Sequence, residues 1–319
     1  MNPIVDQFLA CRKPADFYRL QILLECDAAP GEIASAFGQE SLLPREAADW
    51  LAHARRMMFV QSARVQPYGR RRIAPHVALY PGRRGEGEPR ELLVAFCGLA
   101  DRLQVPVPVV LQHLDARRYD VLLLRDPTKR IYLQGVPDYA PDLAQVAERI
   151  RRDLDLSGYH AIQTFGTSGG GWAAFTVGTL LGAERAISMS GRPPGATFRL
   201  ARMWERRGYS LDEQDADFTV FERLFNQAPV RSTKLFNFFG ADCETDLEGA
   251  EAFERTVGAV AIGFRGVDHH NLMLELLKSA RLGKFLHRYL AGDQGDIVPL
   301  PGERILDLAV LDDPPAAAG

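Results

Sequence analysis

From about residue 90 onward, short apolar runs alternate with longer amphipathic segments, and this alternation limits the fold more than any other feature of the chain. The apolar runs contain few polar residues, as expected of strands that are buried on both faces of a sheet. They occupy residues 91–97, 119–125, 160–166, 185–190, 233–240 and 259–264. The helix-like segments occupy residues 141–154, 171–182, 246–258 and 271–290. Strands that alternate with helices in this way predict an α/β fold with a doubly wound, mostly parallel sheet of about eight strands.

The first 80 residues follow a different pattern, which allows two interpretations. Three helix-like segments and then two strand-like segments occupy residues 15–26, 30–38, 44–57, 58–66 and 72–80. In the first interpretation, residues 1–55 are a helical extension and the two strands open the main sheet as antiparallel members. In the second, helices and strands form a winged helix-turn-helix module that reaches about residue 80. The first is favoured because a short glycine-rich turn leads directly into the run at 91–97.

The predicted core covers residues 56–290 and contains one insertion. Residues 191–231 are too long for a simple connection between a helix and a strand, and they are rich in aromatic and charged side chains. We therefore expect a helical cap at this place, inserted over the sheet. Residues 291–319 are expected to form a C-terminal tail, whose last stretch, residues 311–319, has the composition of a disordered segment.

Composition excludes several classes of function. The formal net charge is −3 over 319 residues, which provides no general attraction to nucleic acid or to an anionic membrane. The four cysteines, Cys11, Cys26, Cys97 and Cys243, lack the spacing of a zinc site, a redox motif or a disulfide framework. The sequence shows neither a secretory signal nor an apolar run of about 20 residues. We therefore expect a soluble, cytoplasmic protein with reduced thiols, without a metal or cofactor, and with neither nucleic acid nor membrane as a partner.

A cluster of glycines surrounds one serine where a strand-like run meets a helix-like segment. Gly166, Thr167, Ser168, Gly169 and Gly170 match the pattern G-x-S-x-G, which in this context holds a serine on a sharp strand-to-helix turn. The glycines leave room for the turn and let the helix approach the strand. A dinucleotide-binding loop needs G-x-G-x-x-G early in the fold, and a P-loop needs a following Lys-Ser or Lys-Thr; neither is present here. Ser168 is therefore the predicted nucleophile.

A serine hydroxyl is a weak nucleophile, so it needs a base and a carboxylate that orients the base. When the serine lies on such a turn, the acid follows it on a loop after a later strand. The loop after the run at 233–240 offers Asp242, Glu244 and Asp246. Asp246 is preferred because it begins a helix-like segment, and Asp242, which lies nearer the end of the strand, is the alternative.

The base is predicted on the loop after the run at 259–264, where two histidines are adjacent. Neighbouring loop residues point in different directions, so only one of them is expected to reach Ser168. His270 is preferred because it lies closest to the following helix-like segment, and His269 is the alternative.

The chemistry also needs two backbone N–H groups that stabilise an oxyanion. One belongs to the residue after the nucleophile, Gly169. The other is expected on the loop after the run at 91–97, where Gly98 permits a turn and Leu99 supplies the N–H. Cys97 is interpreted as a buried apolar residue and not as a second nucleophile, because it belongs to the strand-like run.

Taken together, the segments GTSGG, GADCETD and GVDHHN and the order of strands and helices resemble the α/β-hydrolase superfamily over roughly residues 90–290. Within it, the likeness is to uncharacterised bacterial hydrolase-like proteins with a GTSxGG turn. The resemblance implies the α/β-hydrolase fold and a triad of Ser168, His270 and Asp246 that acts through an acyl-enzyme. The HGGG motif of many lipases and esterases is replaced by FCGLADRL, so a typical lipase is not expected. The resemblance implies no substrate, since this fold supports many activities.

We thus predict a serine hydrolase that cleaves an ester, thioester or amide, in a small molecule or in a group attached to an acyl carrier or a peptide. One alternative is an acyltransferase or a releasing thioesterase of a biosynthetic pathway with the same triad. Another is a non-catalytic binding or scaffold protein, and the oligomeric state is left open. Basic and aromatic residues of the expected cap are candidates for substrate binding: Arg192, Arg199, Arg202, Trp204, Phe218 and Phe221.

Overall fold

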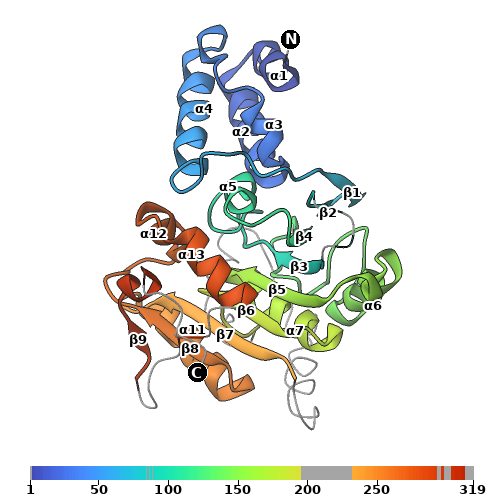
Figure 1. Cartoon of the computed structure of the whole chain (residues 1–319), viewed down its shortest axis with the longest axis vertical. Coiled ribbons are helices and arrows are strands. Elements are labelled where there is room, and N and C mark those ends of the chain that lie inside the picture. The colour runs from blue at the N-terminus through green and yellow to red at the C-terminus, as the bar shows by residue number, and fades with distance from the viewer. Residues whose placement is uncertain are drawn as a thin grey trace.

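The computed structural model describes residues 2–83, 85, 87, 89–194, 232–292, 296–297 and 303–312. These residues form a mostly parallel sheet of nine strands with helices on both faces (Figure 1). The strands are β1 (Arg71–Ala74), β2 (Val77–Tyr80), β3 (Glu91–Phe96), β4 (Tyr119–Leu124), β5 (Ala161–Thr167), β6 (Arg185–Met189), β7 (Lys234–Gly240), β8 (Val260–Phe264) and β9 (Ile305–Leu306). Their spatial order is β1-β2-β4-β3-β5-β6-β7-β8-β9. The predicted α/β fold with a doubly wound sheet is confirmed, with one strand more than expected.

The six apolar runs predicted as strands coincide with β3 to β8 to within one residue at each end. Their pairing from β4 through β3 to β8 is parallel throughout. Successive side chains enter opposite apolar layers: Val121 and Leu123 of β4 belong to one, and Leu122 and Leu124 to the other. Burial on both faces explains why these strands show no alternation of polar and apolar residues.

Each apolar layer is closed by its own set of helices. One layer lies under α12 (Leu272–Lys278), α13 (Leu282–Leu286) and α5 (Val107–Gln112). The other lies under α6 (Leu143–Asp153), α7 (Gly171–Leu181) and α11 (Glu244–Val257). In the first layer the ring of Phe238 is fully buried, with its centroid 4.4 Å from that of Tyr289 and 4.8 Å from that of Phe285. Such aromatic burial holds α13 on the sheet.

The N-terminal helices gather at one end of the molecule (Figure 1). They are α1 (Pro3–Ala10), α2 (Pro14–Asp27), α3 (Pro30–Ala34) and α4 (Arg45–Met58), and α2, α3 and α4 pack on α5. The strands β1 and β2 that follow form a hairpin, and β2 pairs with β4 antiparallel. They therefore open the main sheet, as the first interpretation of this region states, and do not form the wing of a separate module.

Two details of the N-terminal region differ from expectation. The strand predicted at residues 58–66 is wrong: α4 runs to Met58, and the backbone N–H of Gln66 donates to the side chain of Gln112 instead of a neighbouring strand. Helix α1 was not predicted, although Asn2 and Pro3 carry a start signal. The Asn2 side chain accepts hydrogen bonds from the N–H groups of Ile4 and Val5, as an N-cap residue does.

The C-terminal region also differs from expectation. Beyond residue 290, β9 extends the sheet by pairing parallel with β8. Leu311 is buried, and Asp312 forms ion pairs with Arg281 and Lys284. These two residues were expected in a disordered tail, but a buried leucine and a double ion pair attach them to the rest of the fold. Residues 313–319 lie outside the described part of the chain.

The expected cap falls mostly outside the described residues, since the structure describes only 191–194 of its range. No helix in the part of the chain that is described has the length and apolar character needed to cross a membrane.

Candidate active site

Ser168 follows β5 directly and opens the turn into α7. Its φ of 51° lies in the left-handed region, which residues other than glycine adopt only when their surroundings force them to. The neighbouring glycines are required by close packing. A Cβ on Gly166 would lie 2.1 Å from the carbonyl oxygen of Gly170, and a Cβ on Gly170 would lie 2.5 Å from that of Phe96. The glycine-rich segment therefore holds the serine on a tight turn that lies directly against β3.

His270 and Asp246 meet Ser168 at the carboxyl ends of the strands. The His270 Nε2 atom lies 2.8 Å from Ser168 Oγ, and its Nδ1 atom lies 2.5 Å from Asp246 Oδ1. In the tautomer that satisfies both contacts, Nδ1–H donates to the carboxylate and Nε2 accepts from the serine hydroxyl. Asp246 lies in the first turn of α11 and is 1% exposed. A buried carboxylate behind a histidine that contacts a serine is the arrangement of an activated nucleophile.

The alternative acid and base occupy other places. Asp242 Oδ2 accepts a hydrogen bond of 2.8 Å from the N–H of Gly266, so this carboxylate braces the turn after β8. His269 turns away from Ser168, and its Nε2 atom lies 3.0 Å from Glu275 Oε1. The hydrogen bond from Lys278, together with that from His269, holds the pKa of Glu275 below its usual range. The structure thus brings together Ser168, His270 and Asp246, and neither Asp242 nor His269.

The loop after β3 lies beside the serine. A Cβ on Gly98 would lie 3.3 Å from Ser168 Cβ, so only a small residue leaves space here. The N–H of Gly98 donates to the carbonyl of Arg102 at 2.9 Å, which leaves it bonded within the loop. Among the backbone hydrogen bonds of the described residues, none uses the N–H of Leu99. Of the two N–H groups on this turn, that of Gly98 is therefore bonded within the loop and that of Leu99 has no backbone acceptor.

A second loop at the site carries no motif that marks it in the sequence. It follows β4, and both Ile131 and Tyr132 have left-handed backbones, with φ of 52° and 64°. Asp126 holds this conformation by accepting the N–H of Tyr132 at 2.8 Å. The side chain of Ile131 packs on Gly169, where a Cβ would approach its Cγ2 to 2.5 Å, and its carbonyl accepts from Trp172 Nε1 at 2.8 Å. This strained loop buttresses the turn that carries Ser168.

The loops after β3 and β4 are tied to each other. An ion pair joins Lys129 Nζ to Asp101 Oδ2, and both residues have left-handed backbones. The Tyr132 hydroxyl shares its proton between the carbonyls of Cys97, just after β3, and Leu124, the last residue of β4, and it lies 2.9 Å from each oxygen. Burial raises the pKa of the Cys97 thiol well above its ordinary value, which agrees with its interpretation as a buried apolar residue.

Only one of the expected substrate-binding residues falls within the described chain. Arg192 follows β6, and its guanidinium donates to the carbonyl of Thr245 at 2.6 Å, which brings it beside the helix turn that carries Asp246. The remaining candidates lie outside the described residues: Arg199, Arg202, Trp204, Phe218 and Phe221.

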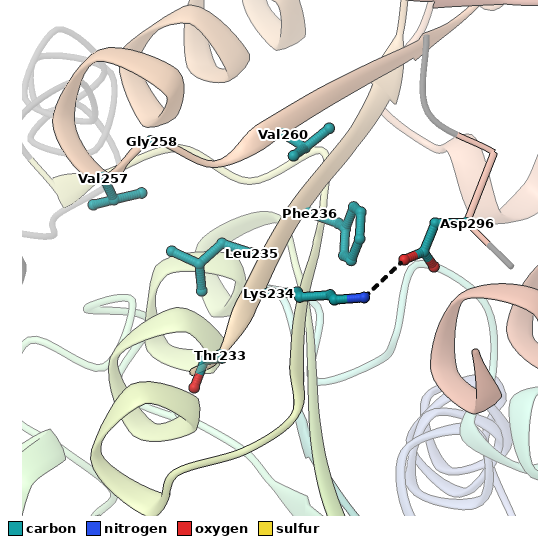
Figure 2. Close-up of a pocket in the computed structure, with 8 residues that line it drawn as sticks. All are labelled: Thr233, Lys234, Leu235, Phe236, Val257, Gly258, Val260 and Asp296. Carbon is teal, nitrogen blue, oxygen red and sulfur yellow. Dashed lines mark ion pairs between the residues drawn. The ribbon is translucent and has the colours of Figure 1, made fainter. Parts of the chain in front are cut away.

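A hollow of about 440 Å³ lies elsewhere on the sheet (Figure 2). It is lined by the start of β7, including Lys234 and Phe236, by Val260 at the start of β8, and by Asp296, whose carboxylate lies 3.6 Å from Lys234 Nζ. Both strands begin at this hollow, whereas Ser168 lies where the parallel strands end. The hollow is therefore at the amino ends of the strands, opposite to Ser168. Within the residues that the structure describes, no group of histidine, cysteine and carboxylate side chains has the arrangement of a metal site.

Comparison with known proteins identifies the fold. No protein-family model and no curated protein matches the chain. The acylaminoacyl peptidase of Pyrococcus horikoshii is similar in structure, with a TM-score of 0.52 and 13% identity over 73% of this chain and 43% of that chain. An acylaminoacyl peptidase in complex with Z-Gly-Gly-Phe-chloromethyl ketone gives a TM-score of 0.50 and 13% identity, over 78% and 44%.

An esterase from the archaeon Pyrobaculum calidifontis has 16% identity over 88% of this chain and 98% of its own, with a TM-score of 0.48. The chain spans less than half the length of the two peptidases that it matches. The similarity to these peptidases shows that the chain has the α/β-hydrolase fold.

Proposed function

We propose that the chain is a serine hydrolase that cleaves an ester, thioester or amide through an acyl-enzyme on Ser168. One observation carries the proposal: His270 contacts the Ser168 hydroxyl at 2.8 Å and the buried Asp246 carboxylate at 2.5 Å, one on each ring nitrogen. A ring held between a strained serine and a buried acid is suited to accept a proton from that serine.

The roles of the three residues follow from these contacts. Neutral His270 accepts the Ser168 proton at Nε2 as the serine oxygen attacks the substrate carbonyl carbon. Asp246 accepts the Nδ1–H bond, fixes the tautomer and stabilises the imidazolium that forms. His270 then donates the proton to the leaving group, whose bond to the carbonyl carbon breaks, and an incoming water repeats the sequence to release the acid.

The tetrahedral intermediate needs donors for its negative oxygen. We assign them to the N–H groups of Gly169 and Leu99, since the N–H of Gly98 is bonded to Arg102. Each donor of this kind lowers the barrier by about 3 kcal/mol in comparable enzymes. The ties between the loops after β3 and β4 support this assignment, because donors stabilise a transition state only when they are held in place beforehand.

The proposal is tested by intact-protein mass spectrometry after treatment with a fluorophosphonate, which reacts with activated serines. We expect one adduct on Ser168 that is lost in Ser168→Ala and formed at least 100-fold more slowly in His270→Ala. The matched control is His269→Ala, which removes the adjacent ring that pairs with Glu275 and should leave the rate within about twofold. Absence of an adduct on folded protein, or an adduct on another residue, would favour a non-catalytic scaffold. Analysis of the products released from thioester and ester probes then separates hydrolysis from acyl transfer.

A further inference from the structure

Gln104 joins the two loops that flank Ser168. It belongs to the loop after β3, and its side-chain amide makes two hydrogen bonds to the loop that carries His270. Gln104 Nε2 donates to the carbonyl of His270 at 2.6 Å, and Gln104 Oε1 accepts from the N–H of Met273 at 3.1 Å. In the reverse direction, Asn271 Nδ2 donates to the Gln104 carbonyl at 3.0 Å. Three hydrogen bonds therefore connect Gln104 to a segment of four residues that begins with the histidine.

The backbone of Gln104 is held in an unfavourable conformation to make this connection. Its φ is 63°, a left-handed value that is uncommon for a residue with a long side chain. Such a conformation persists when the surrounding contacts over-determine it, and it occurs most often at functional sites. The N–H of Met273 lies in the first turn of α12, where a helix leaves its amide donors without intrahelical partners. The Gln104 oxygen satisfies this donor while the Gln104 nitrogen fixes the carbonyl three residues earlier.

A second glutamine makes the same pair of side-chain bonds, here called a clamp, at the start of α13. Gln61 Nε2 donates to the carbonyl of Ala280, and Gln61 Oε1 accepts from the N–H of Gly283 at 2.9 Å. Both glutamines thus bridge a carbonyl and the N–H three residues later, each at the start of a helix. The clamp by itself only supports the start of a helix. Gln61 is therefore a matched control that separates this support from an effect of Gln104 on His270.

The His270 ring depends on its loop for its position. The imidazole is 45% exposed, so packing alone does not hold it. Asp246 fixes one edge of the ring, and the backbone of His270 is fixed through the bond from Gln104. The loop of Gln104 also lies against Ser168 through Gly98. The clamp therefore connects the His270 loop to the loop that contains Leu99, the predicted oxyanion donor.

We infer that Gln104 is a positioning residue that holds His270 in line between Ser168 and Asp246 and couples it to the oxyanion loop; this inference rests on the proposed function. A displacement of about 1 Å in a catalytic group can lower a rate by about 100-fold. Loss of the clamp should therefore slow the reaction of Ser168 without unfolding the protein, while loss of the Gln61 clamp should not.

Three variants separate these effects. Gln104→Ala removes both side-chain bonds, and Gln61→Ala removes the equivalent pair at the start of α13. Gln104→Glu keeps the acceptor for the N–H of Met273 but donates to the His270 carbonyl only when its carboxyl is protonated. Because a facing carbonyl favours the protonated form, this variant should recover toward wild type as the pH is lowered from about 8 to about 5.

The first measurement is the ¹H NMR resonance of the His270 Nδ1–H, which lies far downfield when it donates to a carboxylate and is assigned by its loss in His270→Ala. We expect it to be retained in Gln61→Ala and broadened by exchange in Gln104→Ala, with both variants folded by circular dichroism. This readout requires no turnover, so it decides the role of Gln104 even if wild-type Ser168 proves unreactive, a result that would refute the proposed function alone.

The second measurement is the rate of fluorophosphonate labelling. We expect Gln104→Ala to be roughly 10- to 100-fold slower than wild type, Gln61→Ala to be within about twofold, and the ratio of Gln104→Glu to wild type to rise as the pH falls. A retained resonance with unchanged labelling in Gln104→Ala would overturn the inference. An equal loss of labelling rate in Gln61→Ala would also overturn the inference, as would a ratio of the Gln104→Glu rate to the wild-type rate that does not change with pH. Either result would assign the effect to general support of α12 and α13.

Discussion

The last residue of α2, Asp27, joins the N-terminal helices to the sheet, and its replacement provides a sharp test of how the two are connected. Its side chain is 2% exposed and three arginines surround it. Arg70 Nη1 lies 2.6 Å from Oδ2, Arg72 pairs with the same oxygen, and Arg125 Nη2 lies 3.5 Å from Oδ1. The first two arginines belong to the β1 hairpin region and the third follows β4, so one carboxylate joins α2 to two segments of the sheet.

The expected loss of stability in Asp27→Asn follows from the burial of each partner. Removing one member of a buried ion pair costs about 3–5 kcal/mol, because the remaining charge is left without compensation. Arg70 and Arg72 are 33% and 44% exposed, so water screens their pairs and each contributes little. Arg125 is 12% exposed and suffers most from the loss. We therefore expect Asp27→Asn to lower the free energy of unfolding by about 3 kcal/mol, at the lower end of that range.

The assay is equilibrium unfolding in urea at neutral pH, monitored by circular dichroism. The free energies of unfolding of wild type and variant are compared with the same dependence on urea concentration (m value) for both proteins. The control is Asp49→Asn, which removes a 3.7 Å pair with Arg45 in which both side chains are at least 75% exposed and should cost less than about 0.5 kcal/mol. A loss below about 1 kcal/mol for Asp27→Asn would refute the reasoning, because the carboxylate would then behave as a surface group.

Two further changes test the serine turn and the pH dependence of the fold. In Gly170→Ala the added Cβ would lie 2.5 Å from the carbonyl oxygen of Phe96 and 2.8 Å from that of Cys97. We expect this variant to lower the free energy of unfolding, measured in urea, by about 1–3 kcal/mol and to slow fluorophosphonate labelling at least tenfold. Unchanged stability and labelling would contradict the packing described. Burial lowers the pKa of His113 from 6.5, so the folded state disfavours its charged form and the stability that is complete above pH 6.5 declines as the pH falls below it. His113→Gln should flatten this decline between about pH 7.5 and 5.5, and parallel profiles for the two proteins would argue against it.

Much of the fold was predictable because its central strands are buried on both faces. A strand with two buried faces must be apolar throughout, so β3 to β8 are visible as continuous runs and were located to within one residue. Segments stabilised by single side-chain contacts were less predictable. The backbone of Gln66 bonds to the side chain of Gln112 where a strand was expected, and Leu311 is buried where disorder was expected.

In the candidate site, too, the residues fixed by local requirements were predictable and those fixed by contacts with other elements were not. Ser168 could be located from the sequence because its turn needs glycines at fixed offsets between a strand and a helix, which is a local requirement. The sequence likewise limited the acid and the base to two short loops. It could not exclude Asp242 or His269, since the direction of a loop side chain depends on partners in other elements, here Gly266 after β8 and Glu275 of α12.

The sequence by itself determined the layered α/β architecture and the serine on its turn, because these depend on local periodicity and steric need. The expected order of serine, acid and histidine along the chain was implied by the resemblance to the α/β-hydrolase superfamily. Only the tertiary structure decided that His270 lies between Ser168 and Asp246, that Ile131 packs on Gly169 and that Gln104 bridges to His270. Those contacts join residues 24 to 166 positions apart, or pack side chains across separate loops. They arise when folding brings the carboxyl ends of the strands to one edge of the sheet.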